Sequence, residues 1–317
     1  MAFRPWGPAL RGSMSTTAPD IARPSGGLRA RVSAFLYRRR AVKLFLLLAP
    51  PLTWIVVVYL AALAVLLFTS LWIEDELSGQ IIHTLTLDNF RELWNQPVYR
   101  TITQNTLVMA IAVTITDAVL AFPLAYYMVR FASRSMRALL FIGVLMPLWS
   151  SYLIKAYTWR LITSQDGPIN WALGKVGLGP IDIAFSYLAM WLAFSYLWLP
   201  YMVLPVYAAL ERVPRSYLEA SSDLGGRAWI TFRKVIWPLA LPGIAAGSIF
   251  TFSLTLGDYV VPDLVGGNNR DFFGNVIFRF QGVAQNLPFA AAFACVPVVI
   301  VALYLVLMKR LGAFEAL

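Results

Sequence analysis

Few ionisable side chains lie within the long apolar stretches of this chain, and these few are the first candidates for chemistry. Asp117 and Lys155 each stand alone in an apolar run, and Asp258 and Asp263 flank Tyr259 near the end of another. Ionisable residues at membrane depth face the protein interior or a polar pathway, and carboxylates beside aromatic rings attract cations. We therefore take these five residues as candidates for a translocation path or gate. Structural pairing of Asp117 with Lys155, snorkelling of Lys155, and helix termination or a hinge at Asp258 remain alternatives.

Other kinds of site are excluded by what the sequence lacks. One histidine, His83, rules out an HExxH zinc site, and one cysteine, Cys295, rules out a disulfide or a cysteine zinc cluster. The phosphate-binding pattern G-x-x-x-x-G-K-[ST] is absent, because Ile169 stands in place of its first glycine and Val176 follows Lys175. A G-x-S-x-G nucleophile motif is absent as well. We expect no catalytic residue, no metal site and no cofactor bound by this chain.

The elements that position these residues are indicated by composition. The 317 residues are 59% hydrophobic and 13% charged, whereas a soluble domain carries about a quarter charged residues. The mean hydropathy is +0.67, and the apolar residues form long blocks rather than the alternation of a membrane β-barrel. The net charge of +10 is typical of loops that face anionic lipid, so we expect a bilayer and no nucleic acid as partner. The sequence predicts an all-α protein with several membrane-spanning helices.

Six runs are long and apolar enough to span a bilayer, which takes roughly 20 residues. We place the spans at about 44–73, 102–129, 138–158, 183–210, 239–261 and 283–308. An even number of spans puts both termini on one side. With the termini in the cytoplasm, 19 of the 26 basic residues lie in inside segments and six in outside segments, as the positive-inside rule requires. Residues 1–43 then form a flexible basic cytoplasmic tail.

Two shorter patterns predict local structure. Residues 87–94, with Asp88 near the start, read as a short amphipathic helix in the first outer loop. In the fifth span, Gly243 and Gly247 form a GxxxG pattern, which allows close packing of helices.

The cytoplasmic segment 211–238 is the most informative loop. Pro214 can start a short helix over residues 216–224, and Gly225-Gly226 can end it in the left-handed conformation. A second helix from about Arg227 should stop at Pro238. Because a short helix cannot bury its own apolar side chains, Leu218 and Leu224 need a partner surface.

This loop resembles the EAA loop of ABC importer permeases, whose pattern is E-A-A-x3-G-x9-I-x-L-P. Glu219, Ala220, Gly225 and Pro238 match in place, while Ser221, Val235 and Trp237 replace the second Ala, the Ile and the Leu. The resemblance covers residues 44–317 and implies the type I ABC importer permease fold with six transmembrane helices. In this family the EAA helix docks on a separate ATPase subunit.

The resemblance also implies roles and partners. Glu219 would accept a hydrogen bond from a basic group of the ATPase, and Gly225 would make the sharp turn. The expected partners are two ABC ATPase subunits that bind ATP and Mg, a second permease that is a paralogue, and an external solute-binding protein, all at a bacterial inner membrane. The implied coupling residues are Leu218, Glu219, Ala220, Ser221, Leu224, Gly225 and Pro238.

The finer resemblance is to the spermidine/putrescine branch of these permeases. It rests on segments 86–90, 105–106 and 123–126 and above all on 146–159, around Lys155, and 257–262, around Asp258. Related branches import ferric iron, thiamine, opines or amino-acid derivatives, and these solutes remain alternatives. An ATP-independent secondary transporter and a membrane-embedded enzyme are further alternatives, against which the EAA loop and the missing catalytic motifs argue.

Overall fold

The computed structural model describes residues 40–75, 78–267, 270–282 and 284–310. The predicted tail therefore lies outside the described residues except for 40–43, which begin the first helix. The chain divides after Ala62 into two units, which are described separately.

The first unit holds most of helix α2 (Arg40–Ser70). Within this unit, large apolar side chains are exposed from Leu44 to Leu60. A helix that is apolar on all sides is suited to lipid or to a neighbouring protein. This helix corresponds to the first predicted span.

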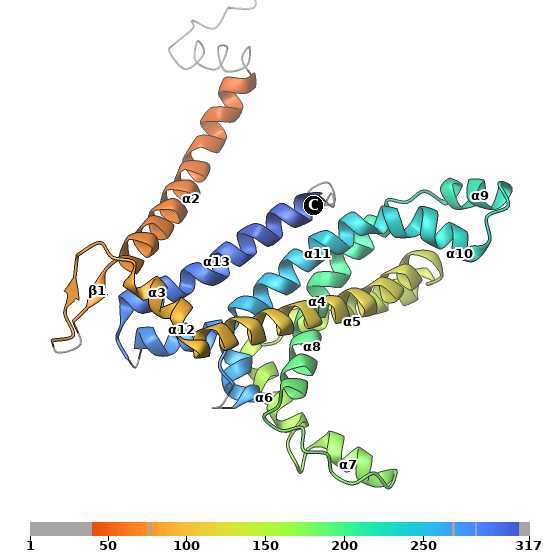
Figure 1. Ribbon diagram of the computed structural model, residues 1–317. Helices are drawn as coiled ribbons and strands as arrows, with labels where there is room; N and C mark the ends of the chain where they lie inside the picture. The colour runs from red at the N-terminus through yellow and green to blue at the C-terminus, as the bar shows by residue number, and fades with distance from the viewer. Residues whose placement is uncertain (1–39, 76–77, 268–269, 283, 311–317) are drawn as a thin grey trace, which may run out of the picture. The chain divides into compact units, whose positions relative to one another are not determined.

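The second unit begins at Leu63 and is built almost wholly of helices (Figure 1). Its only described strands form a small antiparallel hairpin, β1 (Ile73–Glu74) and β2 (Ile81–Ile82). The predicted short helix is present as α3 (Asp88–Asn95). The Asp88 carboxylate accepts hydrogen bonds from Thr86 and Arg91, and these hold its pKa below the usual range. The remaining elements are α4 (Pro97–Arg130), α5 (Arg134–Trp149), α6 (Tyr152–Ile162), α7 (Pro168–Lys175), α8 (Tyr187–Glu211), α9 (Arg215–Asp223), α10 (Ala228–Thr231), η1 (Phe232–Ile236), α11 (Trp237–Gly257), η2 (Pro262–Gly266), α12 (Phe273–Gly282) and α13 (Leu287–Arg310).

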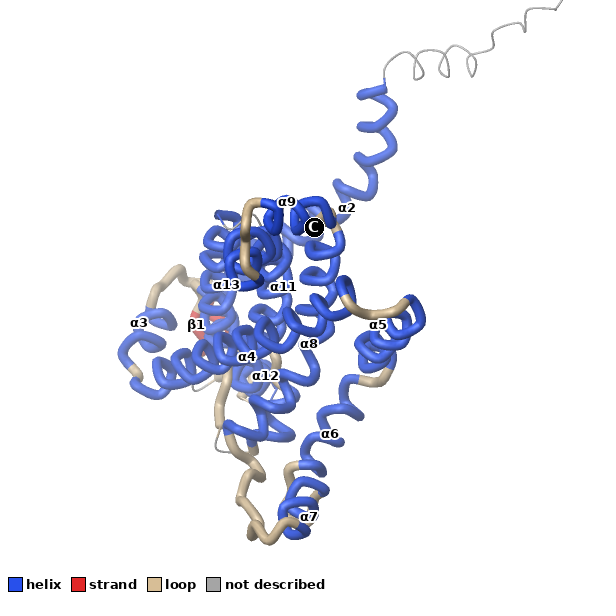
Figure 2. Tube along the Cα trace, turned by 90° about the vertical axis from the view of Figure 1, so that its right-hand side faces the viewer, coloured by secondary structure: helices blue, strands red, loops and turns tan. Residues whose placement is uncertain are grey.

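Three long helices, α4, α8 and α11, pack together as the core of this unit (Figure 2). Met109 and Val113 of α4 share a buried cluster with Phe194 of α8. Eight residues further along each helix, Ala121 of α4 shares a second buried cluster with Met202 of α8. The two helices therefore run in the same direction, and residues of α4 lie level with residues about 80 positions later.

Close approach of α11 to α8 depends on the two glycines of the GxxxG pattern. A Cβ on Gly243 would lie 2.5 Å from the Cβ of Ala209, and a Cβ on Gly247 would lie 2.6 Å from the Sδ of Met202. Both distances are far shorter than van der Waals contact. The expected close packing is confirmed, and α11 runs opposite to α8.

The apolar run predicted as a third span, 138–158, is not one straight helix. It is divided into α5 and α6, which meet at an angle of 98° beside Ser150 and Ser151. Five described helices are long and apolar enough to cross a membrane, and the bent pair gives a sixth if its two parts cross together. The other predicted spans coincide with α2, α4, α8, α11 and α13 within a few residues.

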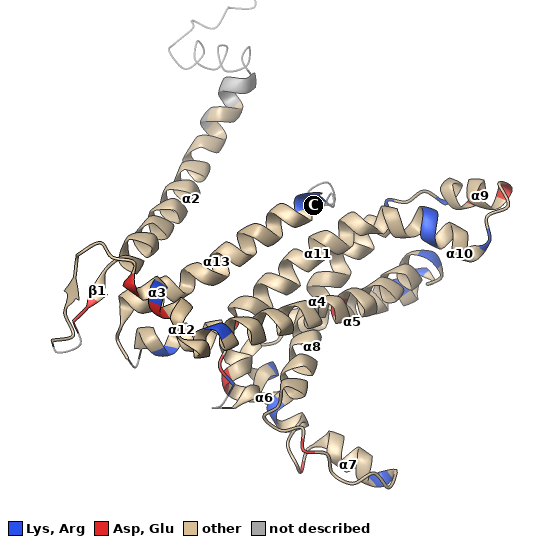
Figure 3. Ribbon diagram, viewed as in Figure 1, with Lys and Arg blue, Asp and Glu red and all other residues tan. Residues whose placement is uncertain are grey.

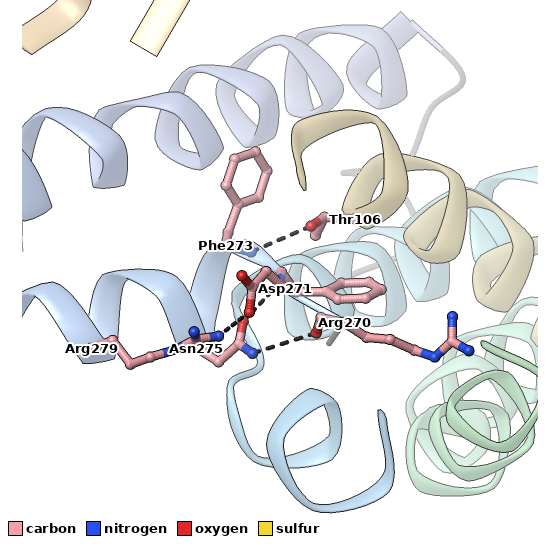
Figure 4. A network of polar contacts seen from close by, with 7 residues as sticks. Thr106, Arg270, Asp271, Phe273, Asn275 and Arg279 are labelled. Carbon is pink, nitrogen blue, oxygen red and sulfur yellow. Dashed lines mark hydrogen bonds and ion pairs between the residues drawn. The ribbon is translucent and has the colours of Figure 1, made fainter. Parts of the chain in front are cut away.

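A network of polar contacts holds the start of α12 and joins it at one point to α4 (Figure 4). The backbone N–H of Phe273 donates to the Thr106 hydroxyl over 3.3 Å. The Asn275 amide oxygen accepts from the backbone N–H of Phe272 at 2.7 Å, and Arg279 pairs with Asp271. These contacts order the segment between α11 and α13, next to the candidate residues at the end of α11.

Candidate functional site

The predicted helix–turn–helix of the EAA loop is formed by α9, a glycine turn and α10. As expected, α9 starts directly after Pro214. Gly225 has a φ of +75°, in the left-handed region, and has open space around it. At Gly226 a Cβ would lie 2.5 Å from the carbonyl oxygen of Ser221. The first glycine is thus required for its backbone angle, and the second for close approach to α9.

The two arms of this hairpin are joined by hydroxyl groups. Ser221 Oγ and Thr231 Oγ1 lie 2.8 Å apart, and the N–H of Gly226 donates to the carbonyl of Ser221 at 2.8 Å. Ser221 stands where the family pattern has alanine. The departure from the pattern therefore adds a contact between α9 and α10.

A shallow groove of about 450 Å³ lies between the arms. The side chain of Leu224 on its rim is 89% exposed, and Tyr217 and Ile230 are also exposed. Leu218 lies elsewhere, half-buried against the cluster that holds Met202 and Ile236. Of the predicted apolar docking residues, only Ala220 and Leu224 line the groove, whose residues are Tyr217, Ala220, Ser221, Leu224, Gly226, Ile230, Lys234 and Val235.

The prediction that the second helix stops at Pro238 is wrong. The chain stays helical from Ala228 to Gly257 through a π-helical turn, η1, directly before the proline. In this turn the N–H of Trp237 bonds to the carbonyl of Phe232, five residues back. The wider turn accommodates Pro238, which has no N–H to donate. The EAA hairpin is thus continuous with α11 rather than separated from it.

Basic residues gather at the end of the unit that carries this hairpin (Figure 3). Arg130, at the end of α4, donates to the carbonyl of Val213, just before α9, at 3.0 Å. Arg137 of α5 donates to the carbonyls of Met128 and Val129, the last turn of α4. These residues connect the hairpin and the core helices.

Asp117 and Lys155, two of the five path candidates, do not pair with each other. Asp117 is fully buried in the core, and neither carboxylate oxygen has a hydrogen-bond partner among the described residues. Lys155 Nζ donates to the carbonyl of Pro147 at 2.8 Å, across the bend between α5 and α6. The Ser150 hydroxyl donates to the same carbonyl at 3.0 Å. Lys155 therefore adds a charged donor to a carbonyl at the end of α5, where the helix leaves its last carbonyls without partners of its own.

Asp258, Tyr259 and Asp263 lie where α11 ends. Asp258 is 9% exposed, and its carboxylate accepts the hydroxyl of Tyr152 from α6. Tyr259 is 45% exposed and stacks on Phe278 of α12, with ring centroids 4.9 Å apart. Asp263 is exposed in η2. Asp258 is thus part of the junction between helices, whereas the other two face outward.

Sequence reasoning missed Tyr152 and Trp198 at this junction. Their rings stack with centroids 5.8 Å apart and planes 16° from parallel. Tyr152 falls within the segment around Lys155 that resembles the polyamine branch, so a signal was present. No feature of the sequence pointed to Trp198, because an aromatic residue near the end of a span is ordinarily assigned to the membrane interface.

Comparison of the sequence with known protein families identifies the family to which this chain belongs. The sequence profile of the family described as "Binding-protein-dependent transport system inner membrane component" matches residues 44–313. The chain belongs to this family. It is the non-catalytic permease subunit of an ABC importer, a multi-pass protein of a bacterial inner membrane.

Relatives and solved structures agree with this assignment. The permease is 48% identical to the inner membrane ABC transporter permease protein YdcU of Escherichia coli (strain K12), over 93% of this chain and 97% of the relative. It is 31% identical to the spermidine/putrescine transport system permease protein PotB of the same strain, over 81% and 93%. A chain of the bacterial alginate ABC transporter, solved with its alginate-bound periplasmic protein, superposes with a TM-score of 0.71 at 15% identity, covering 90% of this chain and 98% of that one. The all-helical ABC importer permease fold is thereby confirmed.

Proposed function

We propose that this permease imports polyamines such as spermidine and putrescine. Two observations support this solute class. The first is the similarity to spermidine/putrescine permeases over four fifths of the chain. The second is the group of acidic and aromatic side chains at the end of α11, namely Asp258, Tyr259 and Asp263. Carboxylates and aromatic faces are what a flexible polycation needs along its path.

We further propose that the α9–α10 hairpin is the coupling site for a separate ATPase. Glu219 is exposed on α9, and the groove beside it presents Ala220 and Leu224. The groove is mostly apolar, with Lys234 in its lining, and the Glu219 carboxylate is exposed beside it. This surface is suited to a partner with an apolar ridge and a basic residue that binds Glu219. ATP and Mg would be bound by two ATPase subunits and not by this chain.

The proposed assembly contains this permease, a paralogous second permease, the two ATPases and an external solute-binding protein. Transmembrane residues 44–317 would form half of the translocation path, and residues 1–43 a basic tail. The positive-inside rule puts the hairpin and both termini in the cytoplasm. The end of α11 that carries Asp258 then faces the outside, where the binding protein delivers the solute.

Uptake of labelled putrescine and spermidine tests this proposal. Cells with and without the gene are compared, and each strain is tested again with the partner ATPase disabled. Loss of uptake in both cases is expected. Unchanged uptake in cells that lack any redundant system would show that the solute is not a polyamine. The same strains would then be screened with ferric iron, thiamine and opines.

A further inference from the structure

Three helical elements meet at Asp258, namely the α5–α6 pair, α8 and α11. The α5–α6 pair and α11 are interrupted there. The α5–α6 pair breaks directly before Tyr152, and α11 breaks at Asp258, whose backbone is extended. Both breaks lie against α8 in one buried cluster that contains Trp198, Val260 and Val261. In membrane transporters, broken helices bring backbone and side-chain polar groups to the solute.

The two oxygens of the Asp258 carboxylate accept hydrogen bonds from different parts of the chain. Oδ1 accepts the backbone N–H groups of Val260 and Val261, at 2.7 and 3.0 Å, and so caps the short helical turn that follows. Oδ2 accepts the phenolic hydroxyl of Tyr152. The hydrogen bonds to Oδ1 are structural. At Oδ2 a neutral donor, the Tyr152 hydroxyl, is bound to an oxygen that can also bind a cation.

The aromatic surroundings of this oxygen suit an ammonium group. The ring of Tyr152 lies against that of Trp198, and Trp198 in turn lies 5.9 Å from Tyr201 between ring centroids. A protonated amine that reaches Oδ2 therefore comes within range of aromatic faces, which attract cations. The nearest basic residue on α6, Lys155, is bound to the carbonyl of Pro147.

One group at this junction is unsatisfied in the present conformation. The indole N–H of Trp198 is buried and has no acceptor among the described residues. A buried donor without an acceptor costs free energy. The indole ring stacks on that of Tyr152, so this buried polar group lies beside the Asp258 carboxylate and its tyrosine partner.

We propose that Asp258 Oδ2, together with the rings of Tyr152 and Trp198, binds one protonated amino group of the solute, and that the amine displaces the Tyr152 hydroxyl. The inference rests on the proposed import of polyamines and names their contact within this chain. An ammonium group donates three hydrogen bonds and accepts none, so it can replace the hydroxyl at Oδ2 while Oδ1 keeps its capping role.

Two substitutions separate this exchange from a merely structural contact. Asp258→Asn keeps a side-chain oxygen for the cap and removes the charge. Tyr152→Phe keeps the ring and its stacking and removes the competing hydroxyl. The complete transporter, reconstituted in liposomes with ATP and saturating loaded binding protein, is assayed for uptake of labelled spermidine and putrescine. Matched controls are Asp166→Asn in an exposed loop and Tyr157→Phe on the exposed side of α6.

We expect Asp258→Asn to slow uptake roughly tenfold or more, the effect of losing one hydrogen bond to a charged group. Tyr152→Phe should transport at the wild-type rate or faster, and both controls should match wild type. Equal losses in Asp258→Asn and Tyr152→Phe would overturn the proposal, because a structural latch loses the same contact in both. Wild-type rates in Asp258→Asn would overturn it too. If the wild-type complex transports neither amine, the proposed solute itself is wrong.

Thermal unfolding of each purified variant complex completes the test. Because the cap is retained in Asp258→Asn and the stacking in Tyr152→Phe, we expect midpoints within a few degrees of wild type. If Asp258→Asn unfolds early, equilibrium binding of labelled spermidine to the Tyr152→Phe complex decides the matter. Binding at least as tight as wild type supports displacement, and weaker binding overturns it.

Discussion

The hydroxyl groups of Ser221 and Thr231 lie 2.8 Å apart on opposite sides of the Gly225–Gly226 turn. They join the two arms of the hairpin that we propose to couple the permease to its ATPase. The family pattern has alanine at position 221, so the hydroxyl is an addition to the basic design. In the proposed coupling, force on α9 would pass to α11 through this contact and through the continuous helix from Ala228.

The hydroxyl contact should therefore be useful but dispensable. We expect Ser221→Ala to lower the free energy of unfolding by about 1 kcal/mol, the typical value of one hydrogen bond, and to keep at least half of the uptake. Thr231→Val removes the same contact and should have the same effect. Thermal unfolding and solute uptake are the measurements. Complete loss of uptake in Ser221→Ala would mean that the serine contacts the partner directly.

Substitutions at the turn should uncouple ATP hydrolysis from transport. Gly225→Val forces a branched residue into a φ of +75°, at a cost of roughly 1 to 2 kcal/mol, and misplaces the groove. Glu219→Lys reverses the charge offered to the ATPase. In each variant complex we expect ATP hydrolysis without matching uptake, both assayed in liposomes. Normal uptake in either variant would refute the assignment of the coupling hairpin.

Packing of α11 on α8 should be sensitive to a single methyl group. Gly243→Ala places a Cβ 2.5 Å from that of Ala209, and we expect a loss of about 1 to 3 kcal/mol, as in overpacked cores. Gly143→Ala is the matched control, because Gly143 also lies in a helix but has open space around it. Alanine favours helix there by up to about 1 kcal/mol. Equal midpoints of thermal unfolding for both variants would contradict the close approach seen at Gly243.

Much of this fold could be predicted because membrane helices follow from composition. An apolar run the length of a bilayer must be helical to satisfy its backbone, and Gly225 after a short amphipathic run marks a turn. The sequence also singled out Asp258 and Lys155, and both make side-chain contacts at the broken helices. What composition cannot reveal is how a run of apolar residues bends. The break before Tyr152 is held by Lys155 and by Asp258, which lies about 100 residues later in the chain.

Two other differences have similar causes. Pro238 does not end the helix, because a π-helical turn before it absorbs the missing hydrogen bond. Leu218 of α9 packs inward, while Leu224, the first residue after α9, is exposed. A spacing of six residues, at about 100° per residue, turns the two side chains to different sides. Which of these sides meets the core depends on how α9 lies against it, and the sequence of α9 does not contain that information.

We expect Lys155 to contribute to the stability of the fold and not to contact the solute. Its ammonium group caps the Pro147 carbonyl at the bend, so Lys155→Met leaves that carbonyl without its charged donor. We expect a loss of about 1 to 3 kcal/mol in the free energy of unfolding. Thr158→Val, another polar-to-apolar change on α6, is the control because the Thr158 side chain only bonds to its own helix. A large fall in uptake with unchanged unfolding would instead assign Lys155 to the path.

Asp117 should tolerate the loss of its charge. Its carboxylate is fully buried between helices and has no donor within the described part of the chain, so ionisation at this place is costly. Asp117→Asn keeps the volume and removes the ionisable group. We expect unfolding midpoints equal to or above that of wild type, because the amide has no charge to bury, and uptake within about twofold of wild type. Asp117→Lys, which adds length and opposite charge at the same site, should abolish assembly. If Asp117→Asn unfolds normally but transports at a tenth of the wild-type rate or less, the carboxylate takes part in transport, and the core must open during the cycle to admit a cation.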